Sequence, residues 1–162
     1  IERAALWSGT GWQAIGGGFD DVVLALAADG ADIYAGGAFL RADGEAIRRI
    51  AAWAGGAWLA MGGGQGLDGE VQALAIFQGE LIAAGDFLAA GQQSLARIGR
   101  WNGTRWIPLG AGFDNTVSAL AVYDGDLYAG GMFTASGGAG LSHVARWTGD
   151  AWAPLSGGVG GC

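Results

Sequence analysis

Short apolar runs alternate with turns rich in Gly and Asp along the whole chain, at a spacing of roughly ten residues. Runs of this length that are rich in Val, Ile, Leu, Tyr and Trp predict β-strands. Four runs recur in a fixed order, and we name them strands A, B, C and D. In the last complete repeat they cover residues 117–123, 126–130, 143–147 and 152–155. The chain is therefore predicted to be all-β and to consist of a repeated four-stranded unit.

A pair of tryptophans separated by four residues marks each repeat. The pairs are Trp7/Trp12, Trp53/Trp58, Trp101/Trp106 and Trp147/Trp152, and they account for all eight tryptophans. The first tryptophans of successive pairs are 46, 48 and 46 residues apart. Each pair flanks the turn between strands C and D, which makes the two indoles a cross-strand pair on one sheet face. We interpret the pairs as packing between neighbouring units; the alternative is an aromatic, lectin-like binding face.

Turn and proline positions predict the strand order within a unit. Asp124-Gly125 between strands A and B indicates a type I′ hairpin, and Asp29-Gly30 and Gln78-Gly79 are expected to occupy the same place. Pro108 and Pro154 place strand D at a sheet edge, because proline cannot donate to a ladder. Strand A, with its Ala-Leu-Ala core, suits a crowded position near an axis. Antiparallel sheets that run from A inside to D outside, repeated radially, form a β-propeller.

The chain, taken as one segment over residues 1–162, is predicted to hold about three and a half blades. Residues 1–16 supply only strands C and D, and residues 22–62, 71–110 and 117–156 each supply a blade. Closed propellers need about four to eight blades. Because the chain begins at Ile1 inside a repeat, without Met, we expect a processed form or a portion of a longer propeller, or a chain completed by another copy or chain. Alone it would expose apolar faces and open strand edges.

The repeat resembles the kelch-like propellers of the galactose oxidase type, and most of all their bacterial variants. The residues that carry the resemblance are the double glycines Gly36-Gly37 and Gly130-Gly131, weakened to Ala84-Gly85, with Tyr34 or Tyr128 before them and a Trp pair downstream. Essentially the whole chain takes part. The resemblance implies a propeller that is secreted or lies on the cell surface. It leaves the activity open, since propellers of this kind serve as enzymes, lectins and scaffolds.

Composition and charge argue against several classes of binding partner. The net charge is −7 and every basic residue other than one His is Arg, so the chain repels phosphate backbones and nucleic acid is not expected as a partner. No apolar run reaches the roughly 18 residues of a membrane span. Cys162, the only cysteine, is the last residue, which rules out an internal disulfide.

Two charged positions recur in the longer loops on one predicted rim, where ligands of propellers usually approach. The acidic position lies three residues before the strand A valine, and the basic position lies four residues before the first Trp. The residues are Asp20, Asp68 and Asp114, and Arg3, Arg49, Arg97 and His143. We interpret them first as ion pairs or loop caps that hold adjacent blades in register. The alternative is a ring that binds an ionic ligand or a partner protein.

Catalytic and metal motifs are weak in this sequence. His143 and Cys162 alone cannot supply a copper or zinc ligand set, and no G-x-S-x-G elbow is present. The glycine clusters join strand to strand and lack the helix N-terminus of a phosphate cradle. We therefore expect no enzyme activity, no metal and no cofactor. The first hypothesis is a structural or protein-interaction module that presents rim loops, the second is a carbohydrate-binding propeller, and the third is a fragment of an enzyme whose active residues lie on missing blades.

Overall fold

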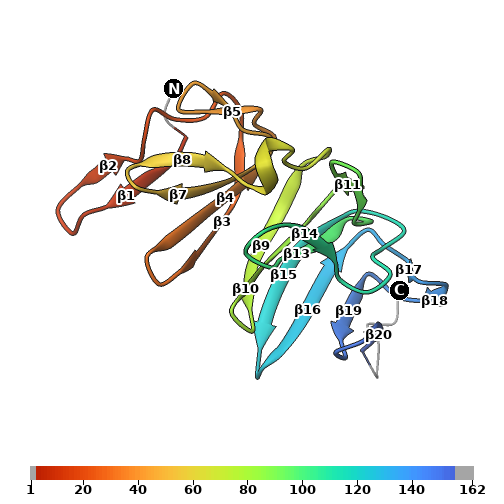
Figure 1. Cartoon of the computed structure of the whole chain (residues 1–162). Coiled ribbons are helices and arrows are strands. Elements are labelled where there is room, and N and C mark those ends of the chain that lie inside the picture. The colour runs from red at the N-terminus through yellow and green to blue at the C-terminus, as the bar shows by residue number, and fades with distance from the viewer. Residues whose placement is uncertain (1–2, 156–162) are drawn as a thin grey trace.

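Three four-stranded antiparallel sheets dominate the computed structural model, which describes residues 3–155 (Figure 1). The first blade contains β3 (Val23–Asp29), β4 (Asp32–Gly37), β7 (Ile50–Ala54) and β8 (Ala57–Ala60). The second contains β9 (Val71–Phe77), β10 (Glu80–Gly85), β13 (Ile98–Trp101) and β14 (Trp106–Pro108). The third contains β15 (Val117–Tyr123), β16 (Asp126–Gly131), β19 (Val144–Trp147) and β20 (Trp152–Pro154). Cys162 and the end of the last predicted blade, residue 156, lie outside the described residues.

The predicted fold class and strand order are confirmed. In every complete sheet the hydrogen-bonded order follows A, B, C, D, and the sheets are consistent with propeller blades. The A strands β3, β9 and β15 lie next to one another, and the D strands are at the opposite edges (Figure 1). Pro108 and Pro154 sit on those edge strands, as their missing N–H requires. The half-blade is the hairpin of β1 (Ala5–Trp7) and β2 (Trp12–Ala14).

The A–B turns are confirmed in two blades and corrected in one. Asp124 and Gly125 both have positive φ, 51° and 81°, as a type I′ turn demands, and Gln78-Gly79 behaves in the same way. The placement of Asp29-Gly30 was wrong by one residue. Asp29 pairs with Asp32 at the end of the ladder, so the first blade turns at Gly30 and the residue after it.

The longer B–C loops contain three short hairpins that were not predicted from the sequence. They are β5 (Arg41–Ala42) with β6 (Glu45–Ala46), β11 (Ala89–Ala90) with β12 (Gln93–Ser94), and β17 (Ala135–Ser136) with β18 (Ala139–Gly140). Two of them are closed by the two-residue turns Asp43-Gly44 and Gly137-Gly138, with positive φ at both positions. The rim on this side is therefore built from ordered hairpins.

Each tryptophan pair is the cross-strand pair predicted, with ring centroids 5.3 to 5.5 Å apart. The second indole of the pair packs on the end of strand D in the preceding unit. Trp58 Nε1 donates to the Ile15 carbonyl at 3.2 Å, and Trp152 Nε1 donates to the Leu109 carbonyl at 3.1 Å. The tryptophans therefore join each blade to the one before it.

The junction between the first and second blades departs from this pattern. The loop that precedes this junction is two residues longer than its equivalents, and it contains the short 3₁₀ helix η1 (Gly62–Gly64). At this junction Trp106 is buried, yet its Nε1 has no hydrogen-bond partner among the described residues. The 48-residue spacing between Trp53 and Trp101 thus coincides with the junction at which the interblade tryptophan hydrogen bond is missing from the described residues.

Candidate functional site

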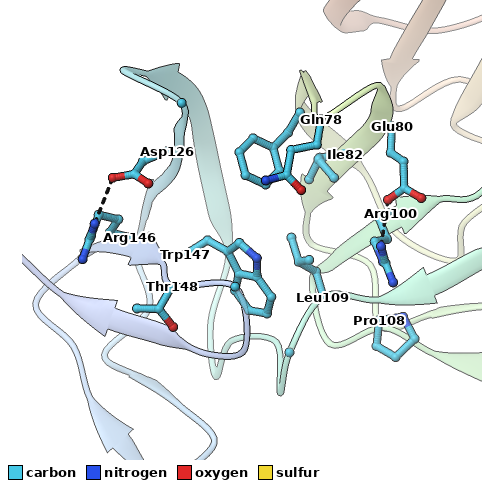
Figure 2. Close-up of a pocket in the computed structure, with 14 residues that line it drawn as sticks. Gln78, Glu80, Ile82, Arg100, Pro108, Leu109, Asp126, Arg146, Trp147 and Thr148 are labelled. Atoms are coloured by element: carbon cyan, nitrogen blue, oxygen red, sulfur yellow. Dashed lines mark hydrogen bonds and ion pairs between the residues drawn. The ribbon is translucent and has the colours of Figure 1, made fainter.

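The candidate site is a cleft between the second and third blades, with a volume of about 410 Å³ (Figure 2). Its walls come from the short A–B and C–D turns and from the strands beside them. Ile82 and Leu109 line it from the second blade, and Trp147 lines it from the third. Gln78 and Thr148 add an amide and a hydroxyl. The cleft therefore combines an apolar floor with hydrogen-bonding groups.

Two ion pairs border the cleft, one on each blade. Arg100 contacts Glu80 and Arg146 contacts Asp126, each through an N–O distance of 2.9 Å (Figure 2). The hydrogen bond to Asp126 raises the pKa of Arg146 above its usual value. The two pairs occupy equivalent repeat positions, since each joins the start of strand B to the residue before the first Trp. In the first blade that second position is Ala52, which cannot form such a pair.

The groups around this cleft can both donate and accept hydrogen bonds. Each guanidinium is already paired with a carboxylate, so the rim of the cleft is close to neutral and offers both donors and acceptors. Such a set suits a neutral ligand rich in hydroxyl groups. The sequence analysis missed the cleft because it looked only at the longer-loop rim. The available signal was an Arg directly before Trp101 and Trp147, opposite an acidic residue at the start of strand B.

The three repeated aspartates lie in the loops that enter strand A, and they cap the neighbouring B–C hairpins. Asp20 accepts the N–H groups of Leu40 and Arg41, each at 2.9 Å. Asp68 accepts those of Leu88 and Ala89 at 2.7 and 2.9 Å. These bonds lie within one blade, so they fix the loops of that blade and support the loop-cap interpretation.

Asp114 makes the same contacts and one more. It accepts the N–H groups of Thr134 and Ala135, and its second oxygen accepts the Thr134 hydroxyl at 2.7 Å. The Thr134 hydroxyl and the two N–H groups lower the pKa of Asp114 to about 2. For Asp20, burial opposes the change, but the N–H groups of Arg41 and Leu40 leave its pKa below the usual value. These carboxylates are stabilised as anions within the fold.

The repeated basic residues do not pair with the repeated aspartates in the described part of the chain. Arg3 contacts Asp21 at 3.1 Å, and Arg97 donates to the Phe113 carbonyl at 2.9 Å, so each reaches the loop that enters the next blade. Within residues 3–155, neither Arg49 nor His143 has a side-chain hydrogen bond. Arg49, Arg97 and His143 have positive φ, of 66°, 72° and 64°. This conformation is uncommon for residues with a side chain, and it recurs where strand C begins.

The two end faces of the blade stack expose residues that are covered elsewhere. Leu74 and Leu120 pack against the A and B strands of the preceding blade. The equivalent Leu26 is 55% exposed, because the half-blade has no A or B strand among the described residues. At the opposite end, Tyr123 is 74% exposed, whereas its equivalent Phe77 is 8% exposed and packs toward the third blade. Exposure at these positions therefore depends on whether a neighbouring blade is present.

The first tryptophan pair follows the same rule. Trp12 is 73% exposed, whereas the equivalent Trp58, Trp106 and Trp152 are almost completely buried against the unit before them. Trp7 is exposed as well. The half-blade thus exposes indole surface that is buried or half-buried in the complete blades.

No helix in residues 3–155 is long and apolar enough to cross a membrane. In the same range, no three His, Cys, Asp or Glu side chains gather as metal coordination would require. A scan against protein-family models found no match, and a search of curated proteins found no significant relative.

Proposed function

We propose that this chain is a non-enzymatic structural and protein-interaction module, a section of a kelch-like propeller that works by joining further protein. The observation that carries the proposal is the contrast between equivalent positions at covered and uncovered blade faces, above all Leu26 against Leu74. Large apolar side chains at an open sheet end are typical of association surfaces. The resemblance to the bacterial variants of kelch-like propellers, which implies a secreted or surface location, supports a place in a larger extracellular or cell-surface protein.

The ordered rim hairpins offer a second surface for a partner protein. In this proposal the residues Asp20, Asp68 and Asp114 hold the hairpins in place, and Arg49 and His143 are available for contact. The chain would then combine end faces that extend the propeller with a rim that binds other proteins.

Sedimentation velocity tests the association of the end faces. The chain should form larger species as its concentration rises, and Leu26→Asp combined with Tyr123→Asp should shift it toward monomer. Leu88→Asp is a matched control, since Leu88 is 50% exposed but lies on a rim hairpin. A chain that stays monomeric at every concentration, or a control that acts as strongly as the end-face variant, would contradict the proposal.

Carbohydrate binding is the second candidate, and the cleft between the second and third blades favours it. The cleft places Trp147 beside two neutralised ion pairs, Gln78 and Thr148, a set that suits a neutral sugar (Figure 2). A glycan array would identify a ligand, and Gln78→Ala should then weaken its binding. Arg105→Ala is the control, because Arg105 lies outside this cleft. Absence of any specific sugar would reject this candidate and leave the first intact.

A further inference from the structure

Within residues 3–155, one edge of strand β1 has no partner strand, at a position that is paired in every complete blade. The C strands β7, β13 and β19 each lie between a D strand and a B strand. Among the described residues, β1 pairs only with β2. The three complete blades therefore show what kind of segment fits beside β1, namely a B strand delivered together with its A strand as a hairpin.

The hydrogen-bond pattern shows which groups of β1 face this edge. Ile15 donates to the Ala4 carbonyl, and Ser8 donates to the Gly11 carbonyl. Hydrogen-bonded and non-hydrogen-bonded pairs alternate along an antiparallel ladder, so the N–H and C=O groups of Ala5 and Trp7 point away from β2. The corresponding residues Ala51 and Trp53 pair with β4. Two donors and two acceptors of β1 are thus aligned for one more strand.

The side chains next to this edge match the same occupant. In the first blade, a Cβ placed on Gly36 would lie 2.4 Å from Val71 and 3.4 Å from Leu74, so this glycine of strand B packs directly on the next blade. An equivalent strand beside β1 would bring its glycine to Val23 and Leu26. Leu26, exposed at present, would then be covered as Leu74 is.

We propose that the half-blade is an acceptor site for a β-hairpin of the A–B pattern, supplied from outside residues 1–162. This inference rests on the proposed function. Its strand B would pair in register with Trp7 opposite the first apolar residue, as Trp53 lies opposite Ile33. Main-chain bonds along β1 would give affinity, and the small glycines would give specificity. A second folded copy is not the donor, because all three of its A–B hairpins are already paired with C strands.

The test adds a synthetic peptide with the sequence of residues 117–131 to the whole ¹⁵N-labelled chain. This peptide contains the Asp124-Gly125 turn, which favours the hairpin. We expect saturable binding, slower amide exchange at Ala5 and Trp7 with little change at Leu6, and a shift of the Leu26 methyl signals. The alternation between Ala5 and Leu6 is the signature of strand pairing and would not arise from non-specific apolar contact.

Two proline variants make the test specific. Ala5→Pro removes an N–H that faces the open edge and should weaken peptide binding about tenfold or more. Ala14→Pro is the matched control, because Ala14 occupies the β2 position that is proline in β14 and β20. The Ala14→Pro variant should bind the peptide as tightly as the parent chain does. Absence of binding, equal effects of the two prolines, or binding without protection of Ala5 would overturn the acceptor site. If the chain still associates through its end faces in those cases, the proposed function stands without it.

Discussion

The second and third blades share one sequence pattern, and they differ in what lies beside them. The second blade is covered on both faces, so its inner strand β9 is buried or half-buried over most of its length. In the described part of the chain the third is covered on one face only, and most of β15 is exposed. A repeat position therefore has no fixed burial. Its environment is set by the neighbouring blade, as expected for architectures in which each unit contacts only its neighbours.

The largest expected effect comes from replacing the last residue of the A strand. Phe77→Ala removes a buried ring from the core between the second and third blades and should lower the free energy of unfolding by about 3 kcal/mol. Tyr123→Ala, at the same position in the third blade, should change it by less than about 0.5 kcal/mol. Chemical denaturation of both variants measures the difference. Equal losses would mean that the open face is covered in solution.

The second-largest difference between the two blades is expected from the tryptophan hydrogen bond. Trp152→Phe leaves the Leu109 carbonyl without its donor, whereas Trp106→Phe removes an N–H that has no partner within residues 3–155. We expect Trp152→Phe to be the more destabilising by about 1–2 kcal/mol, measured by urea unfolding. A larger loss for Trp106→Phe would show that its indole N–H is bonded in solution.

The third comparison concerns the loop aspartates. The unfolded-state pKa of Asp114 is about 3.9, and its pKa in the fold is about 2. A pKa that is lowered on folding stabilises the fold above the unfolded value, and this contribution is lost as the pH falls from about 4 to 2. Thr134→Val removes one donor and should raise the pKa of Asp114, as followed by carboxylate NMR. Thr148→Val is the control, because its hydroxyl bonds to the Ala151 carbonyl, and an unchanged pKa in Thr134→Val would contradict the assignment.

The smallest effect is expected at the cleft. Arg146 and Asp126 form a half-exposed ion pair, and pairs that are exposed to this degree contribute little to stability. Arg146→Met should therefore lower the melting temperature only slightly, and Arg100→Met in the second blade should do the same. A large loss in either variant would indicate that the pair has a structural role beyond the cleft.

Much of the fold follows from the sequence because it depends on local chemistry that recurs. Period, turn residues and edge prolines such as Pro108 are readable one repeat at a time, and they predicted the strand order correctly. The register of the first A–B turn was missed because Asp29-Gly30 resembles the turn dipeptide and lies one position too early. The short rim hairpins were missed although Asp43-Gly44 is the same signal inside a longer loop.

The candidate site was harder to predict because it lies between blades. The cleft brings Gln78 and Trp147 together only when two sheets pack, and no spacing within one repeat indicates that contact. The capping role of the loop aspartates could be predicted, because a short side chain with an acceptor oxygen that lies before a strand commonly caps backbone N–H groups. Trp106 Nε1 has no hydrogen-bond partner within residues 3–155, although the equivalent Trp58 and Trp152 donate to carbonyl groups, and no pattern within one repeat indicates this difference.

The most direct test of the account is hydroxyl-radical footprinting of matched residues at several protein concentrations. At the lowest concentration, Tyr123 and Leu26 should be modified much faster than Phe77 and Leu74, because only the first two lie on open blade faces. As the concentration rises, their modification should slow while that of Phe77 and Leu74 stays constant. If Tyr123 is as protected as Phe77 at every dilution, or if its modification does not change with concentration, the end faces are not the interaction surfaces proposed.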